Sequence, residues 1–217
     1  MSDTPMVQRL RITFGKQGGL KYTSNLDLAK VWERVLRRAQ LPILYTQGFN
    51  ARPRLQIAIA LPLGITSECE LLDVALRERI DIDGLAERIM STSPEGLYVY
   101  DIEEVAIHGN ALEREVESAE YRITFVDEVD QKDLQKRVSE MLAQDRIMKI
   151  EYNRRGKKTA YDLRPLIHDM QVNEEGQLHI HVATGTRGNV RPDMLLAELG
   201  YDDAFVHVHR TQLHIRD

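Results

Sequence analysis

Histidine pairs at alternate positions are the first residues in this chain that could do chemistry. Four of the seven histidines form the pairs His179-x-His181 and His207-x-His209. Side-chain direction repeats every second residue in a strand, so each pair places two imidazoles on one face. Two such strands side by side could hold a metal ion. We expect one strand to separate them, however, which puts them about 9–10 Å apart, whereas a metal needs ring nitrogens at about 2.0 Å. The sequence therefore predicts surface histidines and no metal site.

Two loops rich in glycine and arginine are stronger candidates, for binding an anion. Gly48-Phe-Asn-Ala-Arg-Pro-Arg54 combines an aromatic ring, an amide and two guanidiniums. Gly185-Thr-Arg-Gly-Asn-Val-Arg-Pro192 leads into a predicted helix, whose free N–H groups suit a phosphate or carboxylate. The turn Arg154-Arg-Gly-Lys-Lys158 is also basic. For each segment, the alternative is an ordinary solvated turn.

We assign roles to these residues on that basis. Guanidiniums would contact phosphate, Phe49 and Asn50 a base or partner, and the lysines would be peripheral. The predicted anion- or RNA-binding residues are Arg52, Arg54, Arg187, Arg191, Phe49, Asn50, Lys157 and Lys158. The four arginines are expected to line one cationic cleft.

No catalytic constellation is visible, so we predict no catalytic residue and no cofactor. Cys69 lies between Glu68 and Glu70, whose charges disfavour a reactive thiolate. A single cysteine excludes an internal disulfide, a four-thiolate zinc site and a self-contained iron–sulfur cluster. Neither a P-loop nor a His-Glu-x-x-His pattern occurs.

Composition predicts a globular protein in the cytoplasm. The 217 residues are 42% hydrophobic and 29% charged, with no apolar run long enough for a membrane span and no secretory signal. The net charge of −5 hides an asymmetry: residues 1–60 carry +7, residues 61–130 carry −13 and residues 131–217 carry +1. The basic segment could meet a polyanion, or the blocks could neutralise each other in the fold.

Hydrophobic periodicity predicts the order β-α-β-β-α-β twice. The first copy consists of a strand through Leu10, Ile12 and Phe14, a helix from Ser24 to Ala39, strands 55–61 and 70–76, a helix 84–91 capped by Asp83, and a strand 97–107. The second consists of a strand 121–125, a helix 131–144, hairpins 147–163 and 166–183, a helix from Pro192 to Gly200, and a strand 205–215. We therefore expect an α+β fold of two tandem ferredoxin-like domains with antiparallel sheets. Their expected bounds are 1–110 and 111–217, the second with an inserted hairpin, and residues 108–119 form the joint.

Several short motifs carry a family resemblance over roughly residues 8–215. They are Ser24-Asn-Leu-Asp27, Tyr45-Thr-Gln-Gly-Phe-Asn50, Pro53-Arg54, Leu61-Pro-Leu-Gly64, Glu70-Leu-Leu-Asp73, Asp162-Leu-Arg-Pro165 and Arg191-Pro-Asp193. The chain resembles the uncharacterised radical SAM-linked proteins, which are fused to, or encoded beside, a radical S-adenosylmethionine enzyme. The family often has histidine where this chain has Asn25 and Arg52. The resemblance implies a radical SAM enzyme as partner, with the cluster cysteines on that other chain.

Three functions remain open from the sequence. The first is a non-catalytic accessory module that presents a substrate, RNA or an RNA–protein surface, to the radical SAM enzyme. The second is a metal-independent endoribonuclease of tandem ferredoxin-like type, with a histidine as general base. The third is a protein–protein adaptor that docks through the acidic residues 61–130.

Overall fold

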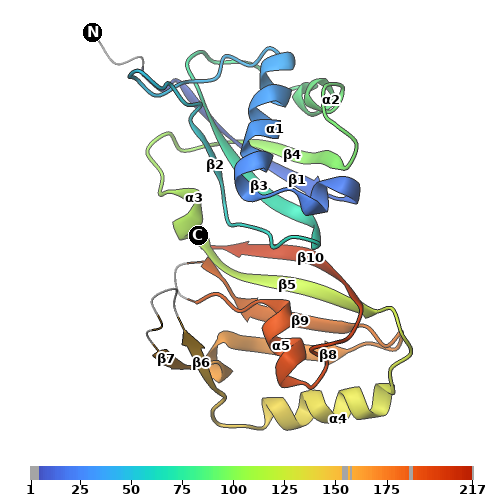
Figure 1. Cartoon of the computed structure of the whole chain (residues 1–217). Helices are drawn as coiled ribbons and strands as arrows, with labels where there is room; N and C mark the ends of the chain where they lie inside the picture. The colour runs from blue at the N-terminus through green and yellow to red at the C-terminus, as the bar shows by residue number, and fades with distance from the viewer. Residues whose placement is uncertain (1–4, 153–155, 157, 186–187, 217) are drawn as a thin grey trace. The chain divides into compact units, whose positions relative to one another are not determined.

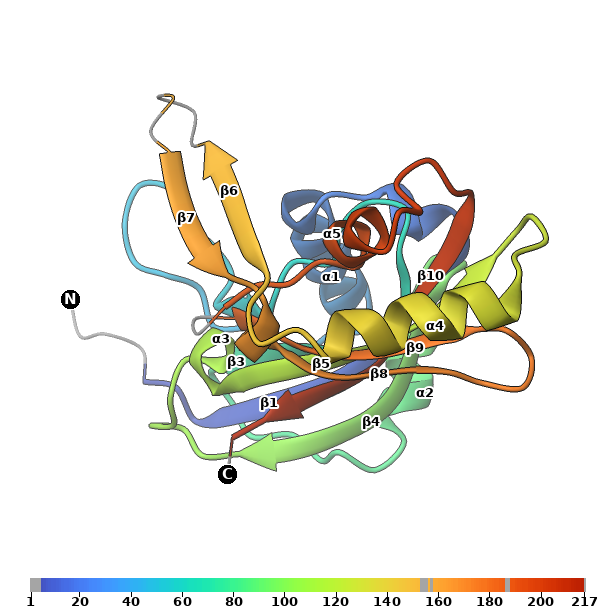
Figure 2. The same cartoon turned by 90° about the horizontal axis from the view of Figure 1, so that it is seen from below.

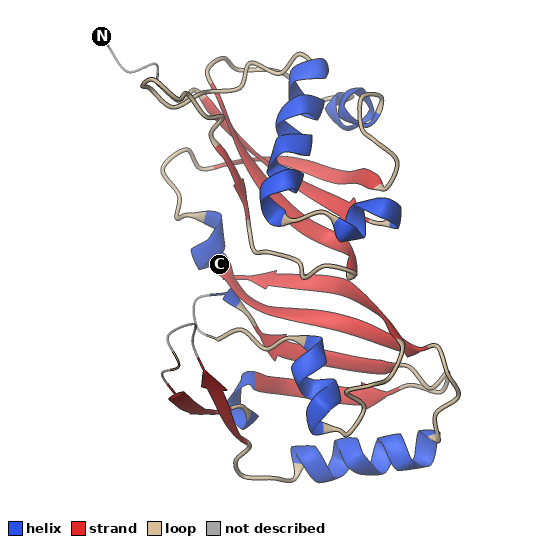
Figure 3. Cartoon of the chain, viewed as in Figure 1, coloured by secondary structure: helices blue, strands red, loops and turns tan. Residues whose placement is uncertain are grey.

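The computed structural model describes residues 5–152, 156, 158–185 and 188–216. They form two compact units: the first runs through Val116 and includes Arg216, and the second is Glu117–Ile215. Each unit combines helices with an antiparallel sheet, which confirms the predicted α+β class (Figures 1 and 3). No helix in the described ranges is both long and apolar enough to cross a membrane.

Unit 1 has a sheet of four strands. Its order is β4-β1-β3, with β2 added on β3, and all three pairings are antiparallel. The elements of unit 1 are β1 (Gln8–Lys16), η1 (Gly18–Tyr22), α1 (Asn25–Arg38), β2 (Leu55–Ile57), β3 (Thr66–Leu76), α2 (Leu85–Met90), β4 (Leu97–Val105) and α3 (Leu112–Glu115). Helices α1 and α2 lie on the same side of this sheet (Figure 1).

The core of unit 1 follows from the predicted periodicity. Leu10, Ile12 and Phe14 alternate along β1 and are fully buried. Helix α1 begins where Ser24 accepts a hydrogen bond from the Asp27 backbone N–H, and it buries Trp32 edge-on against Phe14, with ring centroids 4.9 Å apart. Helix α2 differs from expectation, because Asp83 does not cap it. The N-cap is Gly84 in the left-handed conformation, without a side-chain bond.

The segment after β4 belongs to unit 1. We expected residues 108–119 to be a joint, with the boundary at residue 110. Instead, Leu112 is fully buried in α3, and its backbone N–H donates to Gln56 Oε1 at 3.1 Å. Glu115 forms an ion pair with Arg11 at 2.7 Å. These contacts place the boundary after Val116.

Unit 2 has a sheet in the order β10-β5-β9-β8, in which the pairings of β5 with β9 and of β8 with β9 are antiparallel. The elements of unit 2 are β5 (Val116–Phe125), α4 (Gln131–Leu142), β6 (Met148–Tyr152), β7 (Lys158–Asp162), η2 (Arg164–Leu166), β8 (Ile167–Val172), β9 (Leu178–Ala183), α5 (Pro192–Glu198) and β10 (Val206–Ile215). Helices α4 and α5 cover one face of the sheet (Figures 1 and 2).

The hairpin β6–β7 is the inserted one. These two strands pair with each other as a separate sheet and lie beside the four-stranded sheet of unit 2 (Figure 2). Buried and partly exposed side chains alternate along β5. Ala119, Tyr121 and Ile123 are buried, whereas the intervening Glu120 and Arg122 are partly exposed. The face opposite the helices is therefore polar.

Candidate nucleic-acid interface

The loop between α1 and β2 folds back on itself and exposes its tip. The Thr46 backbone N–H donates to Arg52 O at 2.8 Å, and the Arg52 N–H donates to Thr46 Oγ1 at 2.9 Å. Gly48 has a φ of 122°, which L side chains rarely adopt. Closed in this way, the loop leaves Phe49 with a relative exposure of 104% and Asn50 exposed beside it. The Phe49 ring makes no contribution to the core and is available to a partner.

An open groove of about 690 Å³ lies next to this loop. Both charged residues in its lining are arginines, Arg37 of α1 and Arg77 after β3, and we call it the Arg37–Arg77 groove. Arg77 lies 3.6 Å from Glu78 in an exposed ion pair, which contributes at most about 1 kcal/mol. Among the described residues, Arg37 has no ion pair. Both guanidiniums are therefore available to an anion.

Tyr45 forms part of the floor of the groove. Its hydroxyl donates to Glu33 Oε1 at 3.3 Å. Burial, followed by the negative charge of Glu33, raises the pKa of Tyr45 above 10.0, although the nearby Arg37 opposes this shift. Tyr45 is consequently a neutral hydrogen-bond donor and a half-buried ring at physiological pH.

Arg52 and Arg54 do not line this groove. Arg52 is exposed on the loop, and Arg54 lines a different hollow of about 360 Å³ together with Arg9 and Asp73. Their predicted place in one cationic cleft stays a prediction. The sequence did not single out the groove residues Arg37 and Arg77, because its glycine-rich loops carry the clearer pattern for binding an anion. The cluster Arg34, Arg37 and Arg38 near the end of the predicted helix was the signal that could have found Arg37.

Some of the basic side chains of residues 1–60 are buried in unit 1, where they bind groups of the chain itself. Arg9 donates to Asp73 and to the carbonyls of Ala106 and Asn110. Burial disfavours the charged form of Arg11, but hydrogen bonds and charge from Asp73 and Glu115 outweigh this effect and raise its pKa. Lys16 is also buried, and its Nζ donates to Thr23 O at 2.9 Å. For Arg9 and Arg11, the alternative that the acidic residues 61–130 neutralise the basic segment therefore holds. The exposed basic residues of the segment stay available to a polyanion.

The remaining predicted contacts belong to unit 2. Arg191 is the N-cap residue of α5, forms an exposed ion pair with Asp193 at 3.1 Å, and lines a hollow of about 610 Å³. Lys158 is exposed at the start of β7. Arg187 and Lys157 lie outside the described residues. A single cleft joining arginines of both units stays a prediction.

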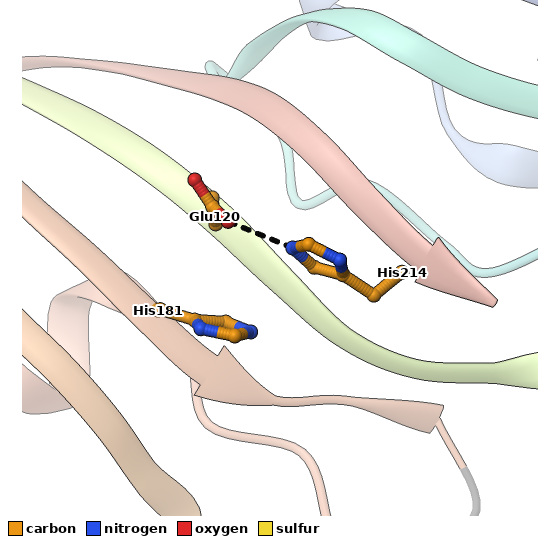
Figure 4. A group of neighbouring side chains, drawn as sticks. All are labelled: Glu120, His181 and His214. Carbon is orange, nitrogen blue, oxygen red and sulfur yellow. Dashed lines mark hydrogen bonds and ion pairs between the residues drawn. The ribbon is translucent and has the colours of Figure 1, made fainter. Parts of the chain in front are cut away.

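A cluster that the sequence analysis did not identify lies on the polar face of unit 2. Figure 4 shows Glu120 of β5, His181 of β9 and His214 of β10 converging from three neighbouring strands. His214 Nε2 lies 2.7 Å from Glu120 Oε1, and the rings of His181 and His214 are 4.8 Å apart. As expected, β5 lies between the strands that carry the pairs His179/His181 and His207/His209. The sequence did not single out His214, which lies further along β10 and meets His181 beside Glu120 of the intervening strand. The predicted strand began at Tyr121, which excluded Glu120.

The surroundings of His181 shift its titration. Burial is the largest cause that lowers the pKa of His181 below 6.5, followed by the nearby rings of His214 and His168. Glu120 and Asp169 act in the opposite direction. His181 is therefore a neutral imidazole at physiological pH.

Comparison with known proteins identifies a family and a fold. The model of a family described as "Uncharacterized protein conserved in bacteria (DUF2344)" matches residues 9–192. No curated protein matches the chain.

Solved structures include a chain of "Crystal Structure of a Cbf5-Nop10-Gar1 Complex", which is 12% identical with a TM-score of 0.51 over 98% of this chain and 51% of that one. A chain of "Crystal structure of the archaeal box H/ACA sRNP Nop10-Cbf5 complex" is 11% identical with a TM-score of 0.47, over 96% and 49%. This chain thus spans about half the length of these two matches. At this identity the first likeness concerns the fold alone.

Proposed function

We propose that this chain, which belongs to the uncharacterised bacterial family DUF2344, is a non-catalytic module that binds single-stranded RNA in the Arg37–Arg77 groove. The observation that carries the proposal is a fully exposed Phe49 on a loop that borders a groove whose charged lining residues are both arginines. Proteins that bind single-stranded nucleic acid commonly combine a positively charged groove with an aromatic ring on which a base stacks.

The arginines and Phe49 would contribute to RNA binding in different ways. Arg37 and Arg77 would neutralise phosphates and release counterions, so binding would weaken as salt rises. Phe49 would stack on an unpaired base, a contact that contributes about 1–3 kcal/mol. Stacking needs a base outside a duplex, which favours single strands and loops over double helices.

The partner in this proposal is a radical SAM enzyme, as the resemblance implies. A module of this kind would hold the substrate while the partner supplies the reacting group. The single cysteine supports this division, because an iron–sulfur cluster needs three or four thiolates.

For the fold, we propose that each unit is a ferredoxin-like domain. In unit 1, four strands in the order β4-β1-β3-β2 pair antiparallel, with two helices on one face. In unit 2, the order β10-β5-β9-β8 has the same form once the hairpin β6–β7 is set aside. Both orders support a split β-α-β arrangement repeated in tandem.

Fluorescence anisotropy with a labelled single-stranded RNA of about 16 nucleotides tests the proposal. We expect binding that weakens between about 50 and 200 mM salt. Phe49→Ala should weaken it about tenfold, the equivalent of about 1.4 kcal/mol of stacking. Arg37→Gln and Arg77→Gln should each flatten the slope of log K against log salt by about 0.7.

Arg88→Gln is the matched control, because Arg88 is an exposed arginine of α2 that does not line the groove. The proposal fails if no RNA binds, or if this control weakens binding as much as the groove variants. RNA cleavage that is lost on a His→Ala change would instead support an endoribonuclease. Salt-insensitive co-purification with the radical SAM enzyme, without RNA, would support an adaptor.

A further inference from the structure

Four neighbouring strands of unit 2 each bring a metal-binding side chain to this cluster. In sheet order these are His214 of β10, Glu120 of β5, His181 of β9 and His168 of β8. The His181 ring lies 4.8 Å from the rings of both His168 and His214. No other group of three or more His, Cys, Asp or Glu side chains among the described residues brings its ligand atoms so close together.

We propose that Glu120, His181 and His214 bind a divalent transition-metal ion. Their ligand atoms already lie within 4.8 Å of one another (Figure 4). In a tetrahedral site with bonds of about 2.0–2.1 Å, the ligand atoms are about 3.3 Å apart. Small side-chain rotations would suffice, because all three residues are half-buried rather than locked in the core. On binding, the ion would replace the 2.7 Å hydrogen bond between His214 and Glu120.

Ser118 supplies a supporting contact to one ligand. This buried residue lies two positions before Glu120 on β5, and its Oγ is 2.8 Å from His181 Nε2. That bond leaves Nδ1 of His181 for the metal. Metal-bound imidazoles usually donate their second ring N–H to a neighbouring acceptor, which fixes the tautomer and the orientation of the ring. Ser118 is placed to be that acceptor.

The ligand set selects the class of ion. Two imidazoles and one carboxylate suit Zn²⁺, Co²⁺, Ni²⁺ or Fe²⁺, whereas Mg²⁺ and Ca²⁺ prefer oxygen ligands alone. Three protein ligands leave a coordination position for water or another small ligand. Glu120 and His181 also line an open hollow of about 440 Å³ with Asp169 and His179. That hollow gives a small ligand access to the open position.

The test uses the full, tag-free chain stripped of metal and titrated with Zn²⁺ by calorimetry. We expect one ion per chain. Loss of a supporting contact such as Ser118 typically weakens metal binding about 10–100-fold. His181→Ala, His214→Ala and Glu120→Gln should therefore each weaken binding by at least about tenfold. X-ray absorption of the bound ion should show nitrogen and oxygen at about 2.0–2.1 Å and no sulfur.

His207→Ala is the matched control, because His207 is an exposed histidine of β10 outside the cluster. It should bind Zn²⁺ as the parent chain does. Thermal midpoints in chelator identify any variant that fails to fold, and His181→Gln then replaces His181→Ala. The proposal is overturned if no stoichiometric ion binds, if the double variant His181→Ala/His214→Ala keeps the parent affinity, or if the absorption spectrum shows sulfur from Cys69.

Discussion

Arg11 of β1 and Asp73 of β3 lie directly opposite each other in the sheet of unit 1 and form a buried, bidentate ion pair. Arg11 Nε donates to Asp73 Oδ1 at 2.9 Å, and Arg11 Nη2 donates to Asp73 Oδ2 at 3.0 Å. Asp73 also accepts from Arg9, so one carboxylate is shared by two guanidiniums. Arg11 extends the network to Glu115 of α3.

Removing this carboxylate should strongly destabilise unit 1. Asp73→Asn leaves two buried guanidiniums without their shared anion, which typically costs about 3–5 kcal/mol. Urea unfolding followed by the fluorescence of Trp32, the sole tryptophan and part of the unit 1 core, measures the change. Asp101→Asn, an exposed position on β4, is the control and should change stability by less than about 0.5 kcal/mol. An equally small loss for Asp73→Asn would refute the network's structural role.

The start of α1 should show a linked change in stability and titration. Ser24→Ala removes the N-cap acceptor of the Asp27 backbone N–H and should cost about 1 kcal/mol. The Ser24 hydroxyl, followed by Lys30, lowers the pKa of Asp27 below 3.8. A lowered carboxyl pKa stabilises the fold above the ordinary pKa, and this contribution is lost as the pH falls through the folded value. In Ser24→Ala, NMR titration should therefore find the Asp27 pKa closer to 3.8; an unchanged value contradicts the assignment.

Two glycines with positive φ should respond differently to alanine. Gly64, with φ of 85°, has open space where a Cβ would lie, so Gly64→Ala should cost only the roughly 1–2 kcal/mol of a left-handed residue. At Gly96, with φ of 88°, the Cβ would in addition overlap the carbonyl oxygen of Gln17. Gly96→Ala should thus cost at least about 1 kcal/mol more than Gly64→Ala in the same urea experiment. Equal losses of stability in the two variants would contradict this prediction and mean that the backbone around Gln17 shifts to make room for the Cβ.

Metal-free protein should lose stability as the pH falls through the titration range of His181. Its pKa is lowered by burial first and then by His214 and His168, so the unfolded chain binds a proton more readily than the folded one. The contribution is complete above the ordinary value of 6.5 and declines as the pH falls towards the folded value. His181→Gln should flatten the pH dependence of the unfolding midpoint below pH 6.5, measured in chelator. His207→Gln, the control, should leave it unchanged.

The periodic parts of the sequence were enough to predict most elements of the fold. Leu10, Ile12 and Phe14 alternate and are buried along β1, and helix α5 begins at Pro192 as expected. These predictions succeed because burial of one face imposes a repeat of two residues on a strand and 3.6 on a helix. Elements without that repeat differ from the prediction. Strand β2 covers only Leu55–Ile57, and α3 lies where the sequence predicts a joint.

The apolar face of each element and the α+β class can be predicted from the order of residues, because both depend on residues that are near one another in the chain. Which charges remain available depends on contacts between distant parts of the folded chain. The tertiary structure pairs Arg9 and Arg11 with Asp73 and leaves Arg37 and Arg77 along a groove. It also brought Glu120, His181 and His214 together. Such contacts depend on how strands are ordered and how far side chains lean across a neighbour, and the spacing of residues along one strand carries no information about either.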